Sequence, residues 1–194
     1  MATQTVAPRR SQGARERILT TASRLFYERG IRNVGIDEII ATAGVAKASL
    51  YKHFASKDAL IVEVLHEQDS AWRRHLEAEV TARADTPKER LLAVFDVLED
   101  WFSEAGFRGC AFINTTVELA SPGHPGHAAS REHKRRIRSY LRELAQAAKV
   151  KDPDALAGQL ALLAEGAIVT ALMEQSAEPA RRAKKAAAQL LAGR

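Results

Sequence analysis

Apolar side chains recur at spacings of three and four residues through almost the whole of this 194-residue chain. In the segment 12–30, Ile18, Ala22 and Leu25 fall on one stripe of a helix, and Gly30 follows as a stop signal. No run of alternating β-branched residues indicates a sheet. We therefore predict an all-α fold of about nine helices whose apolar stripes pack against one another.

Capping signals divide the chain into these helices. Thr86-Pro87-Lys88-Glu89 offers a cap, a proline at the first helical position and the glutamate of a capping box. Asp152-Pro153 repeats the cap-plus-proline start, and Ser56 is placed to cap the helix that begins at Lys57. The predicted helices span residues 12–30, 36–43, 46–54, 57–84, 87–105, 109–120, 127–149, 153–175 and 179–191.

The positive charge of the chain is concentrated near its N-terminus. The first 57 residues hold ten Lys and Arg against four Asp and Glu, a net charge of +6, and the remainder carries −1. A basic head on a near-neutral body is typical of a chain whose first segment meets a polyanion such as a nucleic acid. A solvated, mildly basic domain is the alternative.

Several classes of protein are disfavoured by composition. The single cysteine, Cys110, excludes a disulfide within the chain. We find no apolar run that approaches the roughly 20 residues that span a bilayer, and the N-terminal residues lack the apolar core of a secretory signal. We expect a cytoplasmic protein that does not enter the membrane.

The segment 36–54 has the apolar spacing of a helix-turn-helix. Gly44 permits a tight turn between two short helices, and Val45 fills the angle between them. The apolar side chains of their common core are Ile36, Ile39, Ile40, Leu50 and Phe54. The opposite face of the second helix is then free to enter the major groove of DNA. An ordinary helical corner packed inside a bundle is the alternative.

Residues 43–60, AGVAKASLYKHFASKDAL, resemble the recognition segment of the TetR (tetracycline-repressor) family of transcription regulators, whose usual form is A-G-V-S-x-x-x-L-Y-x-H-F-x-S-K-x-x-L. The resemblance covers roughly residues 12–65, and beyond them it extends only to length and helical layout. It implies a DNA-binding domain at residues 12–56, preceded by a flexible arm at residues 1–11. It also implies a ligand-binding and dimerisation domain at residues 57–194.

The same resemblance implies the DNA contacts. Residues 47–49 would lie nearest the bases, and residues 51, 53 and 57 would bond phosphates. With the exposed face of the helix, this gives Lys47, Ala48, Ser49, Tyr51, Lys52, His53 and Lys57 as the DNA-binding residues. Two positions depart from the family pattern: Ala46 replaces a serine that would cap the recognition helix, and Gly35 replaces a serine or threonine.

The two ends of the chain carry further expectations. Arg9 and Arg10 could reach the minor groove beside the recognition helix, or belong to a tail without function. In the family, two helices of each subunit form a four-helix dimer interface, and the last two helices here suit that role because they are rich in Ala and Leu. The predicted dimerisation residues are Leu160, Leu163, Ala167, Ala171, Ala183, Ala187 and Leu190. These helices could instead cover the core of a monomer.

A ligand pocket is expected between the fourth and eighth helices. The candidate lining residues, apolar and polar, are His66, Trp72, Trp101, Phe102, Phe112, Asn114, Thr116, Glu118 and His133. Each of them could equally belong to the core or the surface. A metal site can be considered at Cys110, Glu118, His124, His127 and His133, but these residues lack the spacing of a metal site, so we predict no metal and no cofactor.

The resemblance therefore implies a TetR-type regulator, a repressor that binds a palindromic operator as a homodimer and is released by an unknown small molecule. No nucleophile elbow, phosphate-binding loop or dinucleotide fingerprint occurs in the chain, and we do not expect an enzyme. A helical ligand carrier that keeps the head as a structural module is the alternative.

Overall fold

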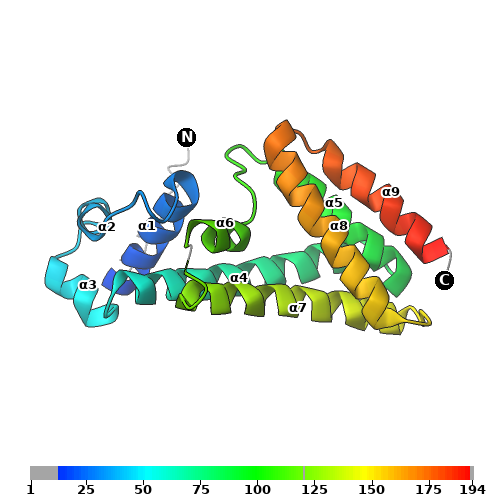
Figure 1. The fold of residues 1–194 in the computed structure, drawn as a ribbon, viewed down its shortest axis with the longest axis horizontal. Helices are drawn as coiled ribbons and strands as arrows, with labels where there is room; N and C mark the ends of the chain where they lie inside the picture. Colours follow the sequence, from blue (N-terminus) through cyan, green and yellow to red (C-terminus); the bar gives the residue numbers. More distant parts are fainter. Residues whose placement is uncertain (1–12, 120, 193–194) are drawn as a thin grey trace, which may run out of the picture. The chain divides into compact units, whose positions relative to one another are not determined.

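The computed structural model describes residues 13–119 and 121–192, and the predicted N-terminal arm lies outside them. Within those two ranges the chain forms nine α-helices and no strand (Figure 1), which confirms the predicted fold class. The helices are α1 Ala14–Arg29, α2 Ile36–Ala43, α3 Lys47–His53, α4 Lys57–Arg83, α5 Pro87–Ser103, α6 Ala111–Glu118, α7 Pro125–Ala147, α8 Pro153–Glu174 and α9 Glu178–Ala192.

The predicted helix caps form. The Thr86 hydroxyl accepts a hydrogen bond from the Glu89 amide at 3.3 Å, and the Glu89 carboxylate accepts one from the Thr86 amide at 3.2 Å. Asp152 accepts from the Ala155 amide at 3.0 Å at the start of α8, and Ser56 caps the start of α4. A cap accepts a hydrogen bond from a backbone amide that has no partner inside the helix. The positions of these helix starts are therefore set by residues close in sequence.

Helices α6 and α7 begin elsewhere than predicted. Gly109 has a φ of 77° and Cys110 is extended, so the backbone cannot turn into α6 before Ala111. Helix α7 begins two residues early, at Pro125, because the Nδ1 atom of His124 accepts a hydrogen bond from the Gly126 amide at 3.0 Å. A histidine cap followed by proline marks this start in the sequence. The prediction missed it because the surrounding segment is rich in turn-forming residues.

The chain divides into two compact units, residues up to Val64 and residues from Leu65. Unit 1 holds α1, α2, α3 and the first turns of α4. Its buried core consists of Ile18, Leu19, Ala22, Leu25, Phe26, Ile31, Val34, Ile39, Ala43, Leu50, Phe54, Leu60, Ile61 and Val64. The domain division predicted after residue 56 stays a prediction.

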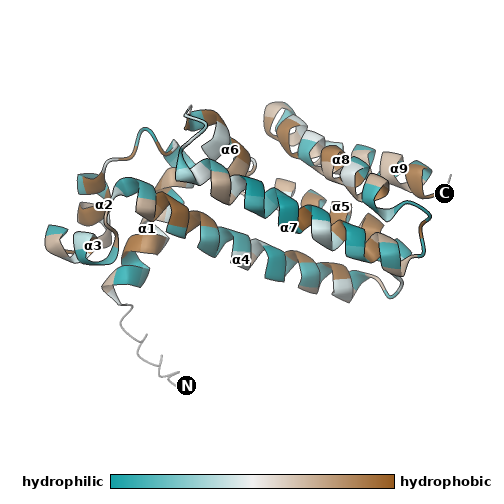
Figure 2. Ribbon diagram, turned by 60° about the horizontal axis from the view of Figure 1, so that its bottom comes forward, coloured by the Kyte–Doolittle hydropathy of each residue, from teal (hydrophilic) through white to brown (hydrophobic). Residues whose placement is uncertain are grey.

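Unit 2 is a bundle in which α8 packs against α5, α7 and α9, and α6 packs on α7. Figure 2 shows that the outer side of α7 is hydrophilic. The largest fully buried side chains of this bundle are Phe95, Leu91, Leu141, Leu156 and Leu160. Each fully buried side chain of this size stabilises the fold by roughly 1.5–3 kcal/mol relative to leaving it exposed.

Helix α8 is more apolar than the sequence reading recognised. By length and composition it could cross a bilayer, a criterion that the core helix of a soluble bundle also meets, and a third of its most apolar window is buried. Its many alanines and leucines lie on every side of the helix, so no polar face interrupts them. Which side of α8 is buried is therefore decided by its packing against other helices.

We expect Gly44→Ala to destabilise unit 1 by about 1–2 kcal/mol, because Gly44 has a φ of 62°, in the left-handed region that costs a Cβ-bearing residue about that much. No atom lies within 4 Å of the position of an added Cβ, so the cost is conformational and not steric. Urea denaturation followed by circular dichroism measures it. Gly44→Asn is the matched control, because asparagine tolerates this region, and it should recover part of the loss. Equal stability of the alanine variant and the parent would contradict the prediction.

Candidate functional site

The turn between α2 and α3 is built around Gly44. Its left-handed backbone lets its amide donate to the Ala41 carbonyl at 3.3 Å, which closes α2. Ile39 of α2 and Leu50 of α3 are fully buried, and Phe54, directly after α3, is buried with them. These side chains hold one face of α3 against unit 1 and leave the other face to solvent, as the helix-turn-helix reading predicted.

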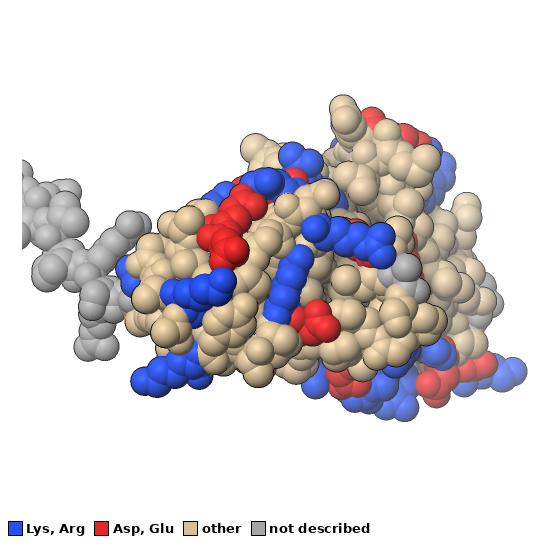
Figure 3. All heavy atoms as spheres, turned by 60° about the vertical axis from the view of Figure 1, so that its left-hand side comes forward, with Lys and Arg blue, Asp and Glu red and all other residues tan. Residues whose placement is uncertain are grey.

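The outer face of α3 carries the side chains predicted to bind DNA. Five of them, Lys47, Ala48, Tyr51, Lys52 and His53, are exposed, and Ser49 is half-buried. Tyr51 is 47% exposed, which is unusual for a large aromatic side chain with an apolar core close by. Figure 3 shows basic side chains spread across this end of unit 1, interspersed with acidic ones. The face therefore offers hydrogen-bond donors, positive charge and a hydroxyl without rearrangement.

Helices α2 and α3 both begin without a side-chain cap. Ala46 and Gly35 stand at the cap positions in extended conformation, and neither accepts a side-chain hydrogen bond. This agrees with the two departures from the family pattern in the sequence. In the described part of the chain, the first backbone amides of α3 therefore receive no hydrogen-bond acceptor from the side chain at the cap position.

Exposed ion pairs partly neutralise the basic head. The Lys47 Nζ atom lies 3.2 Å from the Asp37 carboxylate, and Arg29 pairs with Glu38. Lys52, at the centre of the α3 face, forms no ion pair with any residue that the structure describes. Exposed pairs contribute little to stability, about 0–1 kcal/mol each. A phosphate could therefore replace Asp37 as the partner of Lys47 at small cost.

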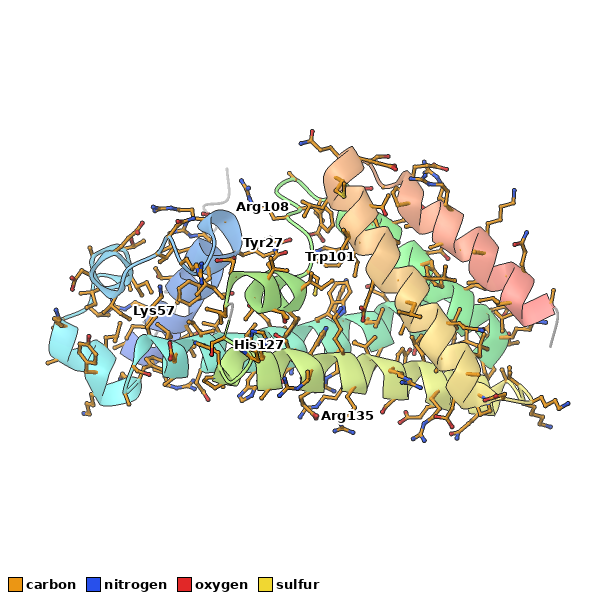
Figure 4. All side chains as sticks on the ribbon, in the orientation of Figure 1. Tyr27, Lys57, Trp101, Arg108, His127 and Arg135 are labelled. Carbon is orange, nitrogen blue, oxygen red and sulfur yellow. The ribbon has the colours of Figure 1, made fainter. Side chains whose placement is uncertain are left out.

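Lys57, at the start of α4, has a structural contact that the sequence did not indicate (Figure 4). Its Nζ atom donates to the Ile31 carbonyl at 2.6 Å and lies 5.9 Å from the centre of the Phe26 ring. It thereby ties the first turn of α4 to the segment between α1 and α2. An ammonium group has three donors, so this bond is compatible with a phosphate contact.

An aromatic cluster joins α4, α5 and the segment after α5 in unit 2. The ring centres of Trp72 and Trp101 are 4.7 Å apart, and Trp101 meets Phe107 edge-on at 5.1 Å. Phe102 lies 5.0 Å from Phe107 and is buried, whereas the other three rings are half-buried. Of the predicted ligand residues, Trp72, Trp101 and Phe102 are thus brought together.

A second cluster surrounds the buried carboxylate of Asp69 on α4. The Nδ1 atom of His133 lies 2.8 Å from one oxygen, and the Arg136 guanidinium donates to the other at 2.6 Å. The Arg73 Nε atom lies 3.1 Å and 3.2 Å from the two oxygens. Burial raises the pKa of Asp69, but the hydrogen bonds from His133, Arg136 and Arg73 outweigh it and hold the pKa below its ordinary value.

His133 is the one predicted ligand residue in this second cluster besides Phe112. Its ring lies parallel to the Phe112 ring of α6, with centres 3.7 Å apart and planes 6° apart. Burial lowers the pKa of His133 to about 4, against the hydrogen bond to Asp69, which raises it. The imidazole is therefore neutral near pH 7. Sequence reasoning missed Asp69 and Arg136, because each looks like an ordinary charged residue on an exposed helical face.

Two further predicted ligand residues bond the backbone around α6. Asn114 donates to the Arg108 carbonyl at 2.9 Å, and Thr116 donates to the Phe112 carbonyl at 2.8 Å. His66 is exposed and Glu118 is half-buried. The amide of Asn114 and the hydroxyl of Thr116 thus serve the local backbone around α6.

The predicted dimerisation residues lie mostly inside the chain's own core. The buried ones are Leu160, Ala167, Ala171, Ala183 and Ala187, and the half-buried ones are Leu163 and Leu190. The five buried side chains pack α8 and α9 into unit 2, where α8 also meets α5 and α7. Their part in a dimer stays a prediction.

The exposed side of α8 carries a different apolar stripe. Leu162 is 72% exposed and Met173 is 80% exposed, with Val169 also exposed between them. With Gly166, these residues follow each other by three or four positions and so share one face of the helix. The sequence could not separate this stripe from the buried one, because both consist of small and aliphatic residues.

Metal-binding groups do not gather in the described part of the chain. No cluster of three or more His, Cys, Asp or Glu side chains that could hold a metal ion occurs there. Cys110 is a free, buried thiol. His127, which sequence analysis considered as a metal ligand, instead bonds the Leu119 carbonyl.

Comparisons with known proteins agree with this geometry. Residues 18–64 match the bacterial regulatory proteins of the tetR family, and residues 87–187 match the tetracyclin repressor-like C-terminal domain. The HTH-type transcriptional regulator YjdC of Escherichia coli (strain K12) is 27% identical over 165 residues, which cover 84% of this chain and 85% of YjdC. The HTH-type transcriptional repressor NemR of the same organism is 29% identical over 106 residues, 54% of this chain and 53% of NemR.

Solved structures give the same result over most of the chain. A TetR-family transcriptional regulator from Streptomyces coelicolor is 35% identical, with a TM-score of 0.79 over 90% of this chain and 93% of that one. The reduced form of E. coli NemR is 25% identical, with a TM-score of 0.81 over 90% of this chain and 94% of that one. A helix-turn-helix with an exposed recognition face, two matched domains and these relatives together identify the chain as a member of the TetR family of DNA-binding transcription regulators.

Proposed function

We propose that this TetR-family regulator is a repressor that binds a palindromic operator as a homodimer, in the bacterial cytoplasm, and leaves it when a small molecule binds unit 2. The exposed face of α3 is the observation that carries the proposal. It presents Lys47, Tyr51, Lys52 and His53 to solvent on a helix whose opposite face is buried. A helix held in this way fits the major groove, with phosphate contacts at its flanks.

The repressor part of the proposal is supported by a relative. NemR, which resembles this chain over 106 residues, is named a transcriptional repressor. Repression by occupancy requires only tight, reversible operator binding, which the α3 face can supply. Three DNA-binding residues near the start of α3 are assigned to bases: Lys47, Ala48 and Ser49. The others are assigned to phosphates: Tyr51, Lys52, His53 and Lys57.

The dimer part rests on the exposed stripe of α8. Leu162, Val169 and Met173 leave a continuous apolar face in solvent, with the small Gly166 between them. No atom lies within 4 Å of the position of a Cβ added at Gly166, so a second helix can approach closely there. Two copies related by a twofold axis would bury this face and pair two α3 helices for a palindrome.

The ligand part rests on the two clusters of unit 2. The rings of Trp72, Trp101 and Phe102 supply apolar and aromatic surface, and the Asp69–His133 pair supplies polar atoms beside Phe112. Aromatic surface with a few fixed polar groups is the usual composition of small-molecule sites in proteins. A ligand that changes the packing around α4 acts on a helix whose first turns belong to unit 1.

Operator binding should depend steeply on salt. If a dimer neutralises roughly eight phosphates, the logarithm of the association constant should fall with the logarithm of salt concentration with a slope near −7. Lys52→Ala should make the slope shallower by about 2 per dimer, because each subunit loses one phosphate contact. Fluorescence anisotropy with a labelled operator at several salt concentrations measures the slope.

Arg24→Ala is the control for that experiment. It removes the same charge from α1, where Arg24 pairs with Glu28, and should leave the slope almost unchanged. A slope that is near zero for the parent protein, or that responds equally to both substitutions, would show that α3 is not the phosphate-binding element.

Leu162→Glu should produce monomers and abolish operator binding, because it places a charge on the exposed α8 stripe in place of a large apolar side chain. Sedimentation velocity reports the oligomeric state, and the thermal unfolding of each variant reports its folding. Val117→Glu is the matched control: Val117 is 76% exposed, close to the 72% of Leu162, but lies on α6. A dimer that survives Leu162→Glu would place the interface on another surface.

A ligand that binds unit 2 should weaken operator binding, and operator DNA should weaken ligand binding by the same factor. Compounds that raise the melting temperature identify ligands, since binding to the native state stabilises it. Titrations of such a compound with and without saturating operator should then differ by roughly five- to 150-fold in affinity. Equal affinities in the two titrations would rule out release by that compound.

A further inference from the structure

The outer face of α7 carries a concentration of positive charge that neither cluster of unit 2 uses. Six of the twelve residues 131–142 are Lys or Arg and one is acidic, whereas the rest of residues 65–194 carries a net charge of −4. Four arginines follow one another by four, three and four positions, so they share one face of the helix and form an arginine row: Arg131, Arg135, Arg138 and Arg142. The opposite face of α7 holds the buried His133 and Leu144.

Most of the charge of the arginine row is not neutralised by the protein. Arg131, Arg135 and Arg138 are exposed and Arg142 is half-buried. Arg135 points away from the bundle (Figure 4), and it is still 68% exposed although it pairs with Glu132 at 2.7 Å. In the described part of the chain, the other three arginines of the row form no ion pair. The row therefore presents free guanidinium groups to solvent.

These guanidinium groups are arranged along a line and not around one point. At a rise of about 1.5 Å per residue, the row from Arg131 to Arg142 extends over about 17 Å of the helix axis. A small anion can therefore meet only one or two of the four arginines. Duplex DNA carries one phosphate charge per about 1.7 Å of its axis, and so roughly ten phosphates over the same length. The row fits an extended polyanion better than a free phosphate.

The residue types favour DNA over a membrane as this polyanion. Arginine donates to two phosphate oxygens at once through its planar guanidinium, which a lysine cannot do. A helix that binds an anionic membrane also inserts large apolar side chains beside its charges. On α7 the large apolar Leu141 and Leu144 are instead buried in unit 2. The chain also belongs to a family of DNA-binding regulators, so it works at duplex DNA.

We propose that the arginine row of α7 is a second DNA-binding surface, which contacts the phosphates of duplex DNA without reading its sequence. The inference goes beyond the operator contacts proposed for α3. Phosphate contacts carry no sequence information, so any duplex segment is a partner for the row. A regulator held on one DNA segment by α3 can then capture a second segment through α7, and salt releases that segment because the contact is exposed and electrostatic.

The test uses a protein with an impaired α3 face, so that the row is measured separately. In a Lys47→Ala, Lys52→Ala background, fluorescence anisotropy with a labelled duplex of random sequence should still show binding at low salt. Further substitution of Arg131, Arg135 and Arg138 by alanine should weaken this binding by roughly tenfold or more. The slope of log K against log salt should become shallower by about 3 per subunit, because each lost phosphate contact removes about 0.9.

The matched control replaces three exposed lysines of unit 2 that lie off the row with alanine: Lys88, Lys151 and Lys185. It removes the same charge and should leave the slope almost unchanged. Lysine at positions 131, 135 and 138 keeps the charge and should retain most of the slope, which separates the loss of charge from a loss of folding. Thermal unfolding of each variant checks that it is folded.

Equal weakening by the arginine and lysine substitutions would overturn the proposal, because net charge alone would then explain the binding. The absence of duplex binding in the background with the impaired α3 face would overturn it as well. Tighter binding to poly-glutamate or to phosphatidylglycerol vesicles than to the duplex would also do so, since the row would then fit an acidic protein or a membrane.

Discussion

The buried carboxylate of Asp69 is the constraint on which the arrangement of α4, α6 and α7 depends. It is the one acidic side chain among the buried residues that the structure describes, and a buried charge is tolerated only when it is paired and fully hydrogen-bonded. Helix α7 meets this demand with His133 and Arg136, three residues apart and therefore on one face. A slip of α7 by one turn would leave the charge without partners, so Asp69 sets the register of the two helices. Phe112 on the His133 ring extends that constraint to α6.

In unit 1, the seven-residue helix α3 is held in place by one face only, and its other face stays exposed to solvent. So short a helix is not stable alone, since its nucleation costs more than its few hydrogen bonds return. Leu50 and Phe54 anchor α3 in the core, and Gly44 sets its direction relative to α2. Lys57 then fastens the next helix through the Ile31 carbonyl. These contacts fix one face of α3 in unit 1 and leave the other in solvent.

Helix α8 has apolar side chains on both its buried and its exposed side. One side, with Leu156, Leu160 and Ala171, is packed inside unit 2, and the other exposes Leu162 and Met173. A helix with a single partner needs only one apolar stripe, so a second stripe in solvent is an unfavourable feature of a monomer. The proposed dimer removes it. Together, the buried side and the exposed apolar side make α8 as apolar as a membrane-spanning segment.

The amino-acid sequence alone determined the all-α fold, the starts of α4, α5 and α8 and the face of α3 that meets solvent. Each depends on neighbours within about four residues, as in the capping box of Thr86 and Glu89. Tertiary structure alone decided that Asp69 meets His133, 64 residues away, and which side of α8 is buried. Charged residues on a helix look alike in sequence whether or not a partner faces them, and an all-round apolar helix has no periodicity to orient it. Packing against distant helices supplies the information that local spacing lacks.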